Sequence, residues 1–170
     1  GCKKDQEEEQ QPQQDPPTYT NGEGEIGPVG GTILIDDATS PLDGIRLHIP
    51  EGVLGTNEFI KIEPAPESVF FPGDSNALII KISPEGLHFN DDVEITFPLP
   101  ETTHPELLKG YFIDPEEELY SQLSTQVDQG NNVAKIYTDH FSFFTLSPFG
   151  IAASVDMYYH NNKPTATISI

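Results

Sequence analysis

Short runs in which apolar and polar residues alternate fill the chain from Gly30 onward, and this period of two constrains the fold most strongly. In IRLHIP (45–50), the apolar residues Ile45, Leu47 and Ile49 fall on one face of an extended segment, and the intervening arginine and histidine fall on the other. VEITFP (93–98) repeats the pattern. The same reasoning predicts further strands at 32–35, 58–63, 77–82, 110–113, 119–123, 133–138, 141–147, 155–159 and 165–170.

Residues that favour chain reversal separate these runs. Proline, glycine, asparagine or aspartate occurs in FPGDSN (71–76), DPEEEL (114–119), DQGNN (128–132) and HNNKP (160–164). Only PETTHPELLKG (100–110) could hold a short helical turn. The spacing predicts an all-β fold, an antiparallel β-sandwich of about 9–11 short strands.

The first 29 residues have a different composition, rich in glutamine, glutamate and proline and almost devoid of apolar side chains. Such a segment buries too little surface to offset the entropy of ordering, so we expect a disordered acidic tether over 1–29. The sandwich is expected to span 30–148. The remaining segment, 149–170, is expected to form a C-terminal hairpin that packs on or extends the sandwich.

The start of the chain, GCKKDQEEE, resembles the mature end of a bacterial lipoprotein, in which a lipid is attached to the first cysteine. The acid-rich stretch is similar to the signal that sends lipoproteins of Bacteroidetes-type bacteria to the outer-membrane surface. The resemblance implies a lipid on Cys2, the only cysteine in the chain, and membrane contact through that lipid. We therefore expect a lipid-anchored, surface-exposed protein of the bacterial outer membrane.

Charge excludes one large class of partner. With 8 Lys and Arg against 28 Asp and Glu, the net charge is −20, and nucleic-acid binding requires basic surfaces. No apolar run approaches the roughly 18 residues that span a bilayer as a helix. We expect a monomer that needs no cofactor.

Three segments together resemble the ZU-five domain family, the β-sandwich module of ankyrins, netrin receptors and zonula occludens proteins. They are GGTILIDDATSPLDGIRLHIPEGVL (30–54), ISPEGLHFNDDVEITFP (82–98) and DHFSFFTL (139–146). Each motif alone is turn chemistry that many β-proteins share, but their order and spacing cover roughly 30–148. The resemblance implies a β-sandwich. The motifs themselves are mainly structural, because proline cannot donate to a strand ladder and glycine can take a positive φ.

The stretch His140-Phe141-Ser142 has two interpretations. In a nucleoporin and a death-domain adaptor with modules of this family, the peptide bond between Phe and Ser of such a stretch is broken by the protein itself. The resemblance implies that Ser142 would attack the Phe141 carbonyl while His140 takes the hydroxyl proton. The alternative, which we favour, is a closing strand with Phe141 and Phe143 on one face and Phe144 and Leu146 on the other. A regular strand resists cleavage, so a backbone bend at 139–142 would distinguish the two.

Other candidate sites are weaker. Asp91, Asp92 and Asp128 offer oxygen ligands, although without the alternating spacing of a dedicated calcium loop. The histidines have no paired spacing and no cysteine partners, which argues against a zinc site; they are His48, His88, His104, His140 and His160. The chain has no tryptophan, so an aromatic platform for a glycan would use Tyr111, Tyr120, Tyr158 or Tyr159.

The expected function is a non-catalytic, surface-displayed binding or assembly module that recognises an unknown protein or glycan. The first alternative is a self-processing domain cleaved between Phe141 and Ser142. The second is a glycan-binding accessory lipoprotein. The final segment, 165–170, alternates like an edge strand and would pair within this chain or with a partner.

Overall fold

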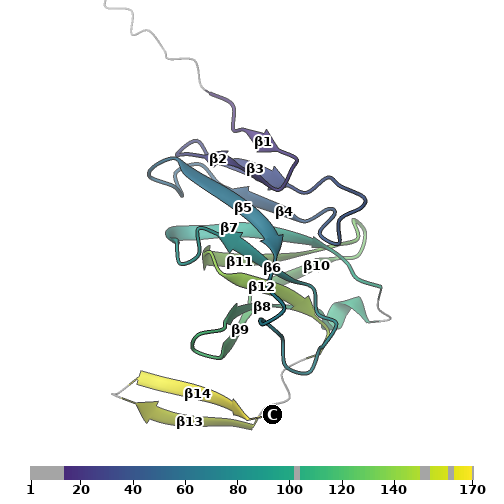
Figure 1. The fold of residues 1–170 in the computed structure, drawn as a ribbon, viewed down its shortest axis with the longest axis vertical. Coiled ribbons are helices and arrows are strands. Elements are labelled where there is room, and N and C mark those ends of the chain that lie inside the picture. Colours follow the sequence, from purple (N-terminus) through teal and green to yellow (C-terminus); the bar gives the residue numbers. More distant parts are fainter. Residues whose placement is uncertain (1–13, 102–103, 150–153, 161–162, 170) are drawn as a thin grey trace, which may run out of the picture.

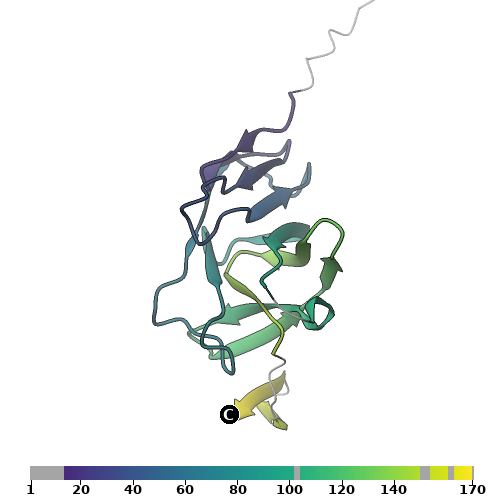
Figure 2. The same ribbon diagram turned by 90° about the vertical axis from the view of Figure 1, so that its right-hand side faces the viewer.

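The computed structural model describes residues 14–101, 104–149, 154–160 and 163–169, with side chains described up to Phe149. The strands form two six-stranded sheets that pack on one another (Figure 1, Figure 2). The first sheet has the order β1 (Thr18–Tyr19), β3 (Gly31–Leu34), β4 (Arg46–Ile49), β7 (His88–Pro98), β11 (Val133–His140) and β10 (Thr125–Asp128). The second has the order β2 (Glu23–Ile26), β5 (Glu58–Pro64), β6 (Ile79–Ser83), β12 (Phe143–Ser147), β8 (Lys109–Asp114) and β9 (Leu119–Leu123).

Neighbouring strands of both sheets run antiparallel, except that β1 pairs in parallel with β3. The described ranges contain one helical turn, η1 (Pro105–Leu107), inside the segment where the sequence allows one. The predicted all-β, antiparallel sandwich is therefore confirmed. Within the part of the chain that the structure describes, no helix has the length and apolar character to cross a membrane.

The core follows the predicted alternation. In β4, Leu47 and Ile49 are buried while Arg46 and His48 are exposed, and β7 buries Val93, Ile95 and Phe97. These side chains belong to one cluster between the two sheets. The period of two therefore places the apolar face of each strand toward the facing sheet.

Strand β12 departs from alternation because all five of its residues are buried. It lies inside its sheet, between β6 and β8. Phe144 and Leu146 face the main core, whereas Phe143 joins a second cluster on the other face of the sheet. That second cluster also holds Phe71 and Tyr111, and the segment between β5 and β6 contributes to it. Both faces of β12 are thus covered.

The N-terminal boundary predicted at residue 29 needs correction. Strands β1 and β2 precede it, and β2 pairs with β5 in the second sheet. Ile26 is completely buried in the main core, and Tyr19 packs against that core. One apolar residue in a polar context was too weak a signal to predict β2. Residues 1–13, including Cys2, lie outside the described residues.

At the other end, β13 (Ser154–His160) and β14 (Lys163–Ser169) pair antiparallel with each other. They form a separate two-stranded sheet and do not extend either six-stranded sheet by pairing. The predicted final strand therefore finds its partner within this chain. The side chains of Tyr158, Tyr159 and His160 lie outside those that the structure describes.

Candidate functional site

The stretch His140-Phe141-Ser142 is bent. Strand β11 ends at His140 in the first sheet and β12 begins at Phe143 in the second, so Phe141 and Ser142 carry the chain from one sheet to the other. Both residues are buried. The predicted continuous strand over 141–147 is therefore wrong at its start, because Phe141 lies in the main core and Phe143 lies in the second cluster.

Hydrogen bonds hold this bend against the turn that links β6 and β7. The Phe141 N–H donates to the Leu87 oxygen at 2.9 Å, and the Gly86 N–H donates to the Phe141 oxygen at 2.9 Å. The Ile82 N–H donates to the Ser142 oxygen at 3.0 Å. Gly86 has a φ of +79°, which glycine adopts without steric strain. The Phe141 N–H and the carbonyl oxygens of Phe141 and Ser142 are thus paired although both residues are buried.

The Ser142 hydroxyl donates to the main-chain oxygen of Ile113 at 3.1 Å. The Nδ1 atom of His140 instead lies 2.9 Å from the Asp139 carboxylate and 3.3 Å from the Thr138 hydroxyl. The bend that self-cleavage requires is therefore present, but the hydroxyl hydrogen of Ser142 is directed to a carbonyl oxygen and not to the imidazole.

A β-bulge brings His140 close to His88, which is 52 positions earlier in the chain. In the pairing of β11 with β7, Thr138 lies opposite Val93, and the next paired residue, His140, lies opposite His88. One residue of β11 therefore spans four residues of β7 (89–92). The two imidazole rings stack with centroids 5.4 Å apart and planes at 27°. Sequence spacing could not reveal this pair because the pairing depends on the bulge.

Asp139 completes a group of three side chains with metal-ligating atoms. One such atom each from His88, Asp139 and His140 lies within 4.8 Å of the others. His140 is the most enclosed of the three, and its ring makes a T-shaped contact with the Phe112 ring, with centroids 4.7 Å apart. The hydrogen bond from His140, opposed in part by burial, holds the pKa of Asp139 below its usual value.

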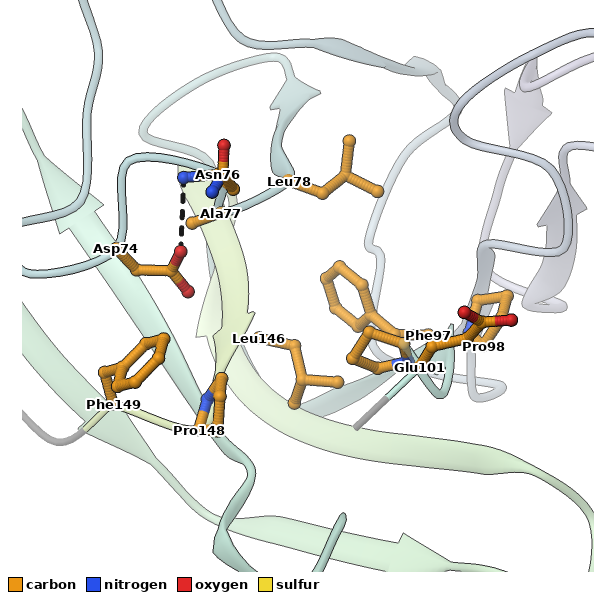
Figure 3. A pocket seen from close by; sticks show the side chains of 11 residues that line it. Asp74, Asn76, Ala77, Leu78, Phe97, Pro98, Glu101, Leu146, Pro148 and Phe149 are labelled. Atoms are coloured by element: carbon orange, nitrogen blue, oxygen red, sulfur yellow. Dashed lines mark hydrogen bonds between the residues drawn. The ribbon is translucent and has the colours of Figure 1, made fainter. Parts of the chain in front are cut away.

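A pocket of about 380 Å³ opens where three chain segments meet (Figure 3). The segment before β6 contributes Leu78, the end of β7 contributes Phe97, and the end of β12 with the residues after it contributes Leu146 and Phe149. These apolar side chains surround one space in Figure 3. Leu78 is 39% exposed and Phe149 56% exposed, so the apolar walls are open to solvent.

Carboxylates stand at the rim of this pocket. Asp74 accepts hydrogen bonds from the Asn76 N–H at 3.2 Å and from the Ser147 hydroxyl at 2.7 Å, which ties the segment before β6 to the end of β12. The Ser147 hydroxyl oxygen also accepts a hydrogen bond from the Phe149 N–H. Glu101 contributes a second acidic side chain. The pocket therefore combines an apolar interior with a negatively charged edge.

The predicted oxygen ligands lie elsewhere. Asp128 accepts hydrogen bonds from the main chain and side chain of Asn131 in the turn between β10 and β11, which lowers the pKa of its carboxyl group. Asp91 and Asp92 are exposed on β7, and the Asp91 carboxylate accepts the Asp92 N–H. Within the described ranges, the group of three metal-ligating side chains includes none of these aspartates.

The predicted tyrosine platform is corrected for Tyr111, which is 3% exposed and packs against Phe71 with ring centroids 4.7 Å apart. Tyr120 is half-buried and meets the same ring edge-on. The buried Tyr111 ring therefore offers no open flat face for sugar stacking. The sequence motifs also did not reveal the pocket, because its walls come from three separate segments.

Comparison with models of known protein families and with curated proteins finds no match for this chain.

Proposed function

We propose that this protein is a non-catalytic binding module that captures a segment of a partner protein in the pocket between β6, β7 and β12. The observation that carries the proposal is the pocket itself. Its volume of about 380 Å³ is within the roughly 300–1,000 Å³ range of ligand pockets and suits one or two apolar side chains. When a ligand binds, the exposed apolar surface of Leu78 and Phe149 would be removed from water, which favours binding.

Charge selects the chemistry of the ligand. Asp74 and Glu101 border the pocket in a protein of net charge −20. A partner segment with an aromatic or aliphatic side chain beside a lysine or arginine would match both the walls and the rim. The burial of Tyr111 makes a glycan ligand the weaker alternative.

The proposal includes display at the outer surface of a bacterial outer membrane, with Cys2 as the lipid attachment site. The polar, acidic residues after Cys2 support it, since they would act as a tether between membrane and sandwich. Replacing Cys2 by alanine should move the protein from the membrane fraction to the soluble fraction. Unchanged retention in the membrane fraction would contradict the anchor.

We also assign the sandwich to the ZU-five type as part of this proposal. The motifs in 30–54 and 82–98 support this assignment, because their glycine and proline residues lie at strand boundaries. Gly30 precedes β3, Pro50 follows β4, and the 84–87 segment leads into β7. Non-catalytic binding is the role that such a scaffold would serve here.

A displayed library of random peptides tests the binding function. The wild-type chain should enrich peptides that combine an aromatic or aliphatic residue with a basic one. Leu78→Asp adds a negative charge to the apolar wall and should weaken binding of the enriched peptides at least about tenfold, or about 1.4 kcal/mol. Leu107→Asp is the matched control, because Leu107 is 54% exposed on η1 and does not line the pocket.

The comparison of these two variants decides the proposal. Equal binding by Leu78→Asp and wild type would place the ligand elsewhere. Failure of the wild-type chain to enrich any peptide family would contradict peptide binding. Circular dichroism of both variants checks that the fold is retained.

A second candidate function, self-cleavage between Phe141 and Ser142, is favoured by one observation. The carbonyl that Ser142 would attack belongs to a bend, and its oxygen already accepts the Gly86 N–H, a donor suited to a developing negative charge. Cleavage requires the Ser142 hydroxyl to leave Ile113 and turn toward His140. Intact mass after prolonged incubation tests it: two fragments that Ser142→Ala abolishes would support cleavage, and a single full-length species would refute it.

A further inference from the structure

We propose that His88, Asp139 and His140 form a binding site for a divalent transition-metal ion, for which Zn²⁺ is the natural probe. His88 is the first residue of β7, and Asp139 and His140 are the last two residues of β11. Their ligating atoms lie within 4.8 Å of one another. Imidazole and carboxylate are both common zinc ligands, and two histidines with one acidic residue are an established combination. This site is independent of the apolar pocket.

The distances require only a small adjustment. Ligands about 2.0–2.2 Å from a tetrahedral zinc ion lie roughly 3.3–3.6 Å from one another. The Asp139 carboxylate and His140 Nδ1 are already 2.9 Å apart. His88 is exposed, so rotation of its side chain can close the remaining gap without disturbing the core.

The surrounding structure holds part of the site in place. The His140 side chain is 16% exposed, and its ring makes a T-shaped contact with Phe112 and stacks with His88. The bulge also places the Asp139 carboxylate beside His140, although adjacent residues of a regular strand point to opposite faces. A fixed histidine with two movable neighbours gives a site that is partly preformed.

The donor set determines the class of metal. Two imidazole nitrogens favour zinc, copper or nickel over magnesium and calcium, which prefer oxygen ligands. Three protein ligands leave a fourth tetrahedral position, and the exposure of His88 and Asp139 opens that position to solvent. The net charge of −20 adds a general attraction for cations.

Calorimetric titration of the full chain without an affinity tag tests the site. The Cys2→Ser background removes the only thiol from competition for the metal. Saturable binding of one Zn²⁺ per chain is expected below about 100 µM, with Ca²⁺ and Mg²⁺ binding at least about tenfold more weakly. Because His88 is exposed, His88→Ala should leave the fold intact and weaken zinc binding at least about tenfold.

His48→Ala is the matched control, since His48 is also an exposed strand histidine but lies on β4. It should bind zinc as the parent protein does. Asp139→Asn, at an exposed position, should weaken binding in the same direction as His88→Ala. Zinc affinity unchanged by His88→Ala, equal binding of Ca²⁺, or no saturable binding would each overturn the proposal.

Discussion

Replacing Phe141 by alanine should destabilise the protein far more than the same change at an exposed phenylalanine. Phe141 anchors the bend that passes between the two sheets, and its side chain is completely buried. The main-chain hydrogen bonds of the bend use N–H and carbonyl groups that alanine also carries. The substitution therefore tests the side chain and not the backbone pairing.

The size of the loss follows from the burial and from one aromatic contact. Truncation of a buried phenylalanine to alanine costs about 3–5 kcal/mol. The Phe141 ring also meets Phe89 edge-on, with centroids 4.8 Å apart and planes at 75°, a geometry worth about 0.5–1.5 kcal/mol beyond area burial. We expect a decrease of about 4 kcal/mol in the free energy of unfolding.

Urea denaturation followed by circular dichroism measures this decrease. Phe59→Ala is the matched control, because Phe59 is 60% exposed on β5 and the unfolded chains change in the same way. It should cost no more than about 0.5 kcal/mol. In a double-mutant cycle, Phe89→Ala combined with Phe141→Ala should reveal a coupling of about 0.5–1.5 kcal/mol. If Phe141→Ala cost less than about 1.5 kcal/mol more than Phe59→Ala, the bend would not depend on this anchor.

Three further outcomes follow from local geometry. Gly110→Ala places a methyl group against an isoleucine of the facing β11 and should cost about 1–3 kcal/mol in urea denaturation, whereas Gly130→Ala, with its nearest neighbour at 3.4 Å, should cost less than 1 kcal/mol. His140→Gln removes the imidazole whose hydrogen bond lowers the pKa of the Asp139 carboxyl, so an NMR titration should find that pKa higher than in the wild type; an unchanged pKa would contradict the contact. Asp128 has a lowered pKa in the folded state, so its ionised form adds stability above its unfolded pKa of about 3.9, and this contribution is lost as pH falls through the folded pKa. The melting-temperature advantage of wild type over Asp128→Asn should therefore shrink between about pH 5 and 2, and an advantage independent of pH would refute this assignment.

The sequence was most informative where one face of a strand is buried. The alternation of β4 and β7 predicted their core residues, because in these strands the apolar side chains lie on the face that packs against the other sheet. The alternation did not predict the bend, because Phe141, Phe143 and Phe144 are all buried. Phe141 and Phe144 lie in the main core, whereas Phe143 lies in the second cluster. A run of apolar residues does not record the point at which the chain changes sheets.

The functional candidates depended even more on three-dimensional arrangement. His88 and His140 carry no sequence signal as a pair, because a bulge sets their register. Leu78 and Phe149 look like ordinary apolar residues in sequence, and only their exposure beside a pocket distinguishes them. The His140-Phe141-Ser142 motif, in contrast, directed attention to a stretch that is bent.

The passage of the chain between sheets also sets the order in which the fold can be completed during synthesis. Strand β6 needs β12 as its neighbour, and β7 needs β11, yet both partners are made much later. From Ser83 to Ser147 the ribosome adds about 64 residues, which takes about 3–13 s at typical rates. During that interval the open edges of β6 and β7 are exposed to other nascent chains, so the last strands of the sandwich end a period of vulnerability to misassembly.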